Sequence, residues 1–130
     1  MRTYMGTDMG ARAPVRRGAA LRSQEISRVF QALADPTRRT VVERLARGPA
    51  STTELARPFD MALPSFAQHL AMLEQCGLVR SQKEGRVRCF ELAPKPLVTA
   101  ESWMAEQHAI WNQRLDQMRD HVEGVKAAKP

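Results

Sequence analysis

The fold is decided by residues 51–92, which read STTELARPFDMALPSFAQHLAMLEQCGLVRSQKEGRVRCFEL. Ser51, with Glu54 three residues later, forms a capping box that predicts the start of a short helix. A second helix is expected over 62–76, because apolar residues recur there at helical spacing and Gly77 supplies a C-terminal stop. Two short helices in succession therefore precede the rest of the segment.

The remaining residues of the segment, 78–92, predict a two-stranded hairpin that turns at Glu84-Gly85. Phe90 and Leu92 share one face of the return strand, so we expect them to anchor it on the core. The tip is locally positive, with Lys83, Arg86 and Arg88, and this charge suits contact with phosphates or a minor groove. An ordinary solvated turn has a similar composition, so the hairpin alone is weak evidence for DNA binding. A helix pair followed by an Arg-rich wing, however, is a way to place one helix in a DNA groove with a ribbon beside it, and we predict DNA binding.

The helix over 62–76 has the surface that a groove-facing helix needs. Phe66, Leu70 and Leu73 form its apolar stripe. At about 100° per residue, the opposite face is small and polar, with no acidic residue before Glu74. That face comprises Pro64, Gln68, Ala71 and Gln75, flanked by Ser65 and Met72. Acidic side chains there would repel phosphates, and bulky ones would block approach to the bases.

The charge of the chain is unevenly distributed. The net charge is +6, but residues 1–22 hold five Arg and one Asp and so contribute +4. These residues lack an apolar period and are expected to be a flexible basic arm. Residues 23–130 carry 15 Lys and Arg against 13 Asp and Glu, which is only +2. Total charge is therefore weak evidence for nucleic acid, and the local pattern must carry the argument.

Order is expected to begin at Ser23 with a first helix, and Asp35-Pro36 should open the next one, which Gly48 ends. Residues 23–93 then form one winged helix-turn-helix domain. The predicted fold class is mainly α with a β-hairpin wing, followed by a long C-terminal dimerisation helix.

A long helix is predicted over 97–122, within a C-terminal unit of 94–124 and before a tail of 125–130. Its apolar stripe is too long for one small domain to cover, so we expect a homodimer interface. The predicted dimerisation residues are Trp103, Ile110, Trp111, Leu115, Met118 and Val122. Packing of this stripe on the first helix is the alternative, and both can hold.

Several other classes of function are not supported by the sequence. Nothing resembles a nucleophile with its base, a phosphate-binding glycine loop or paired carboxylates, so we expect neither an enzyme nor a cofactor. No segment approaches the ~20 apolar residues of a membrane span, and a cytoplasmic protein is expected. Cys76 and Cys89 match no disulfide framework or metal motif. A redox-responsive regulator that uses these two thiols remains an alternative, although two isolated small hydrophobes are favoured.

Four blocks of the sequence resemble the ArsR/SmtB group of bacterial winged-helix repressors. They are Ala32-Leu33-Ala34-Asp35-Pro36-Thr37-Arg38-Arg39, Thr53-Glu54-Leu55-Ala56, the run from Gln68 to Val79 (QHLAMLEQCGLV), and Glu84-Gly85-Arg86. The resemblance covers about residues 24–93. The order and spacing of the blocks are more specific than any single helix-turn-helix pattern. The long last helix is similar to the dimerising segment of a metal-free branch of that group.

The resemblance implies a dimeric repressor that binds a short inverted-repeat operator in double-stranded DNA, often in its own promoter. By position it places Pro64, Ser65, Gln68 and His69 on the recognition helix and Lys83 and Arg86 on the wing. Gln68 could pair with adenine, and Arg86 with phosphate or a narrow minor groove. The helical angle of His69 favours a buried structural histidine over a base contact. A winged-helix protein-interaction module without DNA binding remains an alternative.

Metal sensing is an activity of this group, but the chain mostly lacks the ligands. The helix that begins at Ser51 has no Cys pair for a soft metal. His108 and His121 are thirteen residues apart rather than the eleven of the family pattern, and the two additional residues turn one histidine by about 200° from its place in that pattern. We therefore expect no metal site, and the effector is unknown.

Overall fold

The computed structural model describes the backbone of residues 2–128 and the side chains of residues 17–127. The elements are α1 (Arg2–Leu33), α2 (Pro36–Leu45), β1 (Ala50–Ser51), α3 (Thr52–Ala56), α4 (Leu63–Gln75), β2 (Val79–Glu84), β3 (Val87–Leu92) and α5 (Pro94–Ala128). The three strands form an antiparallel sheet in the order β1-β3-β2. This architecture confirms the predicted winged helix-turn-helix with a long C-terminal helix.

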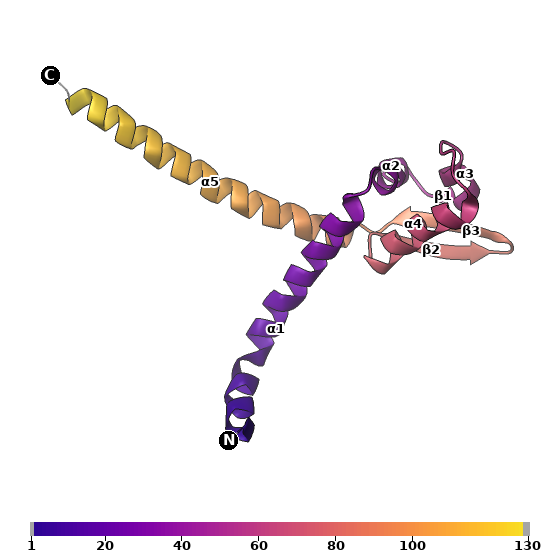
Figure 1. The fold of residues 1–130 in the computed structure, drawn as a ribbon, viewed down its shortest axis with the longest axis horizontal. Coiled ribbons are helices and arrows are strands. Elements are labelled where there is room, and N and C mark those ends of the chain that lie inside the picture. The colour runs from indigo at the N-terminus through magenta and orange to yellow at the C-terminus, as the bar shows by residue number, and fades with distance from the viewer. Residues whose placement is uncertain (1, 129–130) are drawn as a thin grey trace.

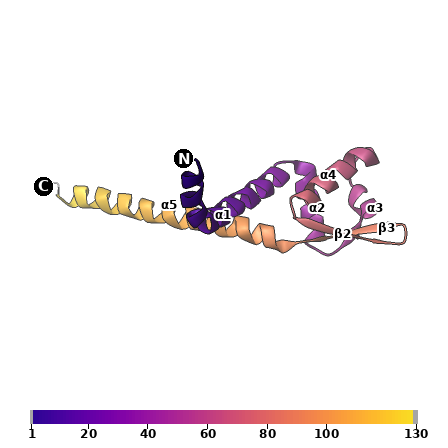
Figure 2. The ribbon, with the colours of Figure 1, turned by 90° about the horizontal axis from the view of Figure 1, so that it is seen from below.

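Helices α2 to α4 and the sheet form a compact body, beside which α1 and α5 cross and then diverge (Figures 1 and 2). Helix α5 runs away from the body in the direction opposite to the β2–β3 hairpin (Figure 1). The β2–β3 hairpin and the far end of α5 therefore lie at opposite ends of the molecule. No helix among the described residues is long and apolar enough to span a membrane.

The core lies where the helices of the body meet the sheet. Its largest fully buried side chains are Phe66, Leu55, Leu73, Leu78, Val29, Val41 and Val79. Phe66 is 0% exposed, and its ring packs against that of Phe59 with the centroids 5.3 Å apart. The stripe predicted on α4 is thus the side that the body buries, and Phe90 joins the same core from β3, as predicted. This burial fixes which face of α4 is left to solvent.

Two arginines join α2 to the end of α1. Asp35 caps α2, because its Oδ2 accepts the N–H of Arg38 at 3.0 Å. The guanidinium of Arg38 donates to the carbonyls of Ala32 (2.7 Å) and Gln31 (3.1 Å), and that of Arg39 donates to the carbonyl of Leu33 (2.7 Å). The last carbonyls of a helix have no partner within the helix, so these arginines fix the corner between α1 and α2.

The capping box at the start of α3 is present as predicted. The N–H of Ser51 donates to Glu54 Oε1 at 2.9 Å, and the N–H of Glu54 donates to Ser51 Oγ at 3.2 Å. The bond from the Ser51 N–H is the main reason that the pKa of Glu54 lies below its usual value. Ala50 and Ser51 also pair with Phe90 and Cys89, so the cap lies at the edge of the sheet.

The hairpin turns one residue later than predicted. Glu84 is the last residue of β2 and pairs with Val87, which leaves Gly85 and Arg86 as the two-residue loop. Gly85 has a φ of +64°, a left-handed conformation that glycine adopts without steric cost. Two-residue hairpin loops need positive φ at their first position, so the glycine sets the turn and Arg86 lies at the tip.

The ends of both long helices differ from the prediction. Helix α1 begins at Arg2 rather than Ser23. Ala19, Ala20 and Leu21, directly before Ser23, are good helix formers, so the helix does not begin at that serine. Helix α5 begins at Pro94 and continues to Ala128, past the expected tail boundary. Proline is tolerated in a first turn, and the chain from 125 to 128 has good helix formers. Residue 1 of the expected arm and residues 129–130 of the expected tail lie outside the described residues. The division into arm, domain, helix and tail stays a prediction.

Candidate DNA-binding interface

The face of α4 that points away from the core carries three of the predicted recognition residues. Pro64, Ser65 and Gln68 are all exposed, while Phe66 and Leu70 on the other side of the helix are buried. Ala67 and Ala71 are exposed beside them and add little bulk. The result is a surface of small side chains, polar at Ser65 and Gln68, on which the Gln68 amide can approach the edges of bases.

The N-terminus of α4 favours a negative partner. Its N-cap residue, Ala62, makes no side-chain hydrogen bond to the first turn, and that turn contains no acidic residue. The unpaired N–H groups of a first helical turn carry the positive end of the helix dipole. A DNA phosphate placed there would meet donors and a favourable field.

His69 is held between α4 and α2. Its side chain is 22% exposed, and its Nδ1 lies 3.3 Å from a terminal nitrogen of Arg38 and 3.6 Å from Oδ2 of Asp35. This half-buried position agrees with the geometric expectation of a structural histidine. Its role in DNA contact, which the resemblance implies, stays a prediction. The N–H of Arg38 is the main reason that the pKa of Asp35 lies below its usual value, and His69 contributes less.

The wing presents Lys83 and Arg86 to solvent, but it holds Arg88 in a hydrogen-bonded chain. Arg88 donates to Ser81 Oγ at 2.8 Å, and the Ser81 hydroxyl donates to Glu74 Oε2 of α4 at 2.7 Å. Helix α4 and the wing are therefore joined side chain to side chain. Arg88 is itself exposed, and the DNA contacts expected of Lys83, Arg86 and Arg88 stay predictions.

Glu74 and Ser81 are functional candidates that the sequence prediction missed. Glu74 had counted only as the first acidic residue on the exposed face of α4. The structure gives this carboxylate a partner on β2, and so explains why an acidic residue is accepted there. Strand alternation puts Ser81 and Arg88 on one face of the hairpin, but only the packing of α4 shows that Glu74 reaches them.

The two cysteines lie on different sides of the sheet. Cys76 is buried in the core at the end of α4. Cys89 is half-buried, and its neighbour Phe90 points into the core, so Cys89 points to the opposite face. A disulfide between them would require the strand to rearrange. Nothing in this arrangement favours the redox alternative.

Possible metal ligands are scattered over the described part of the chain, where no group of three His, Cys, Asp or Glu side chains converges. Glu106, two residues before His108, pairs with Arg22 of α1 at 2.8 Å. His108 and His121 are both exposed on α5.

The predicted dimerisation residues are mostly uncovered. Trp103 is 37% exposed, and its ring meets that of Phe30 edge to face with the centroids 5.9 Å apart. Farther along α5 the apolar side chains are exposed to solvent, with exposed fractions of 58% for Ile110, 62% for Trp111, 65% for Met118 and 46% for Val122. Leu115 is half-buried. Among the described side chains, packing of α5 on α1 thus involves the beginning of the stripe, and the later residues other than Leu115 stay exposed.

Comparison with known proteins gives a consistent class. The helix-turn-helix domain family matches residues 33–82. The HTH-type transcriptional regulator Rv2034 of Mycobacterium tuberculosis is 46% identical over 70 residues, which are 54% of this chain and 65% of that protein, slightly less than two thirds. The arsenical resistance operon repressor of Escherichia coli is 30% identical over 88 residues, 63% of this chain and 75% of the repressor.

Two solved structures extend this comparison. A crystal structure of an ArsR family transcriptional regulator aligns with a TM-score of 0.67 and 51% identity, over 69% of this chain and 93% of that one. The solution structure of a homodimeric winged helix-turn-helix DNA-binding domain from Mycobacterium bovis, a possible ArsR-family regulator, has a TM-score of 0.56 and 26% identity, over 78% and 90% of the two chains.

A helical body with an exposed α4 and a basic wing defines a winged helix-turn-helix DNA-binding regulator. The relatives are transcriptional regulators rather than enzymes, as the sequence predicted. The chain belongs to the ArsR family of transcriptional regulators.

Proposed function

We propose that the protein is a homodimeric repressor that binds a short inverted-repeat operator, in which each copy places α4 in a major groove and its wing beside it. The observation that carries this proposal is the combination of an uncapped, acid-free start of α4 with a wing fixed to its other end through Glu74, Ser81 and Arg88. Regulation of its own promoter is part of the proposal. Repression rather than activation is supported by the similarity to the arsenical resistance operon repressor of E. coli.

The dimer is supported by the exposed stripe of α5. Trp111, Leu115, Met118, Val122 and Val125 follow one another at alternating spacings of four and three residues. That is the heptad repeat by which two helices pack along one seam. We call these five residues the α5 seam. The M. bovis domain, which is homodimeric, supports the same assembly. A twofold dimer presents two reading helices to two half-sites of DNA.

Within each half-site we assign base contact to α4 and phosphate contact to the wing. Gln68 has the amide that pairs with adenine through two hydrogen bonds. Ser65 and Pro64 lie one turn earlier, near the helix start, where phosphate or sugar contact is expected. Lys83 and Arg86 neutralise phosphates or enter a narrow minor groove.

We propose further that the repressor does not sense a metal. The dispersed His, Cys, Asp and Glu side chains of the described residues support this part. A zinc or nickel titration that leaves operator affinity unchanged in the purified protein is expected. Release of the operator by micromolar metal would contradict it.

The interface is tested by operator titration of Gln68→Ala and Arg86→Ala over a series of salt concentrations. Gln68→Ala should lose about 1–3 kcal/mol of discrimination at one base pair of each half-site. Arg86→Ala should weaken binding to all sequences alike and lower the salt slope by about one per subunit. Arg114→Ala, on the exposed surface of α5, is the matched control and should bind as the wild type does. If both test variants bind like this control, the assigned interface is wrong.

A further inference from the structure

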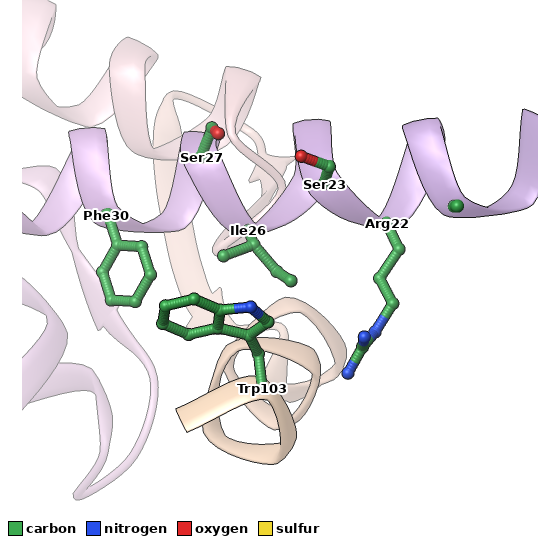
Figure 3. A pocket seen from close by; sticks show the side chains of 7 residues that line it. Arg22, Ser23, Ile26, Ser27, Phe30 and Trp103 are labelled. Atoms are coloured by element: carbon green, nitrogen blue, oxygen red, sulfur yellow. The ribbon is translucent and has the colours of Figure 1, made fainter. Parts of the chain in front are cut away.

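His69 lies at the end of a chain of contacts that connects α5 to α4. In Figure 3 the side chain of Phe30 on α1 points toward the indole of Trp103 on α5. The carbonyls of the two residues after Phe30 accept hydrogen bonds from the guanidinium of Arg38 on α2, at 3.1 and 2.7 Å. Nη1 of Arg38 lies 3.3 Å from Nδ1 of His69 on α4. The corner between α1 and α2 therefore meets α4 at one imidazole nitrogen.

Nδ1 of His69 faces two groups of opposite charge. Arg38 offers it a donor at 3.3 Å, and Asp35, the N-cap of α2, offers it an acceptor, with Oδ2 at 3.6 Å. Helix α4 itself adds no charged residue before Glu74, whose carboxylate is bonded to the wing. A ring nitrogen accepts when it carries no proton and donates when it carries one. Nδ1 can therefore serve Arg38 or Asp35, but not both at once.

The distances match a neutral ring that accepts from Arg38. Oδ2 of Asp35 is beyond hydrogen-bond distance, whereas Nη1 of Arg38 is within it. A proton that binds at Nδ1 removes the lone pair that Arg38 uses and leaves two cations 3.3 Å apart. The imidazolium is then repelled by Arg38 and attracted by Asp35. Protonation therefore draws the ring of His69 away from Arg38 and toward Asp35.

We propose that His69 is a positioning residue. Its neutral Nδ1 holds α4 in the orientation that binds DNA, and a proton on Nδ1 exchanges Arg38 for Asp35 and weakens operator binding. Gln68, to which base contact is assigned, directly precedes His69 in α4, so a movement of the helix at His69 displaces the Gln68 amide. Histidines titrate between about pH 5 and 8, so operator affinity is full above this range and falls as the pH is lowered through it. The effect on affinity rests on the proposed function, whereas the exchange of partners does not.

The exchange of partners is tested without DNA by NMR on the full chain. The chain has three histidines, and His69→Asn identifies the imidazole ¹⁵N signals of His69 by their loss. At pH 8 Nδ1 of His69 should carry no proton. His69→Asn should also raise the pKa of Asp35, followed by the ¹³C signal of its carboxyl, because the imidazolium contributes to lowering that pKa. His121→Asn, on the exposed surface of α5, is the matched control and should leave the Asp35 titration unchanged. A proton on Nδ1 at pH 8, or an Asp35 titration that ignores His69→Asn, would overturn the proposal.

The effect on DNA binding is tested by operator titration at constant ionic strength between pH 8 and pH 5.5. Wild-type affinity should fall roughly tenfold toward pH 5.5, which corresponds to one or two hydrogen bonds in the dimer. In His69→Asn the amide oxygen lies as far along the side chain as Nδ1 and accepts from Arg38, but it binds no proton in this range. This variant should keep its affinity at both pH values, whereas His69→Ala, which has no acceptor, should bind weakly at both. His121→Asn should follow the wild type.

Direct contact of His69 with DNA is the competing role. A cationic ring beside phosphates would strengthen binding as the pH falls, the opposite of the effect expected here. That result, or a pH profile of His69→Asn equal to that of the wild type, would overturn the proposal. If the protein selects no operator, the proposed function fails and the effect on affinity fails with it. The NMR titrations then still decide whether Nδ1 exchanges Arg38 for Asp35.

Discussion

Replacing Trp111 by alanine tests whether the α5 seam holds two copies together. Trp111 is 62% exposed in the single chain. A tryptophan buries ~150–250 Å² when it is covered, which leaves roughly 90–150 Å² of Trp111 for a partner. At ~25 cal/mol per Å² this surface is worth about 2–4 kcal/mol per copy. Because the interface is twofold, each substitution is present in both copies, and its free-energy cost enters the dimerisation free energy twice.

The dissociation constant of the dimer should therefore rise at least about a hundredfold, after allowance for the cost of ordering side chains at an interface. Sedimentation equilibrium over a wide range of protein concentration measures it directly. Gln113→Ala is the matched control, because residue 113 lies about 200° around the helix from residue 111. This control should leave the dimer unchanged. The reasoning is refuted if Trp111→Ala dimerises as tightly as the wild type, or if Gln113→Ala weakens the dimer equally.

Three further predictions concern the body of the molecule. Phe66→Ala should lower the free energy of unfolding by about 3–5 kcal/mol in urea titrations, because the side chain is 0% exposed and the cavity cannot fill with water; a loss below about 1 kcal/mol would contradict the core assigned here. Ser81→Ala should break the link from Glu74 to Arg88 and weaken operator binding several-fold while the thermal midpoint stays close to that of the wild type, whereas Ser81→Thr, which keeps the hydroxyl, should restore binding. The pKa of Asp35 is lowered in the folded protein, mainly by the Arg38 N–H. The ionised carboxylate therefore stabilises the folded protein at pH values above its unfolded pKa of about 3.9. This contribution is lost as the pH falls through the folded pKa. The stability of Asp35→Asn should then depend less on pH below about 4 than that of the wild type, and an unchanged acid profile would exclude this contribution.

The elements that the sequence predicted well are those that local chemistry defines. Asp35 with Pro36, Ser51 with Glu54, and Gly77 each satisfy or end a helix through groups a few residues apart, so α2, α3 and α4 could be placed closely. The buried stripe of α4 followed from helical periodicity, and it also determined that Gln68 lies exposed. The family resemblance added the order of the elements, which local rules alone do not give.

The features that sequence reasoning missed depend on contacts between distant residues. Strand β1 exists because Ala50 pairs with Phe90, and a strand of two residues is too short to show a sequence pattern. The chain from Arg88 through Ser81 to Glu74 exists only because α4 packs beside the wing. The start of α1 was misplaced for a different reason. A serine caps a helix only when its own backbone is extended. Ala20 and Leu21 favour helix, so the backbone before Ser23 stays helical.

The most direct test of the account is a hydroxyl-radical footprint of the purified protein on genomic fragments that it selects. A dimer with two copies of α4 and two wings should protect two half-sites that are inverted repeats of each other, about one helical turn of DNA apart between their centres. Gln68→Ala should lose its preference at one base pair in each half. A single unpaired footprint, or the absence of any selected fragment, would contradict the central claim that two copies of this wing and helix read one operator.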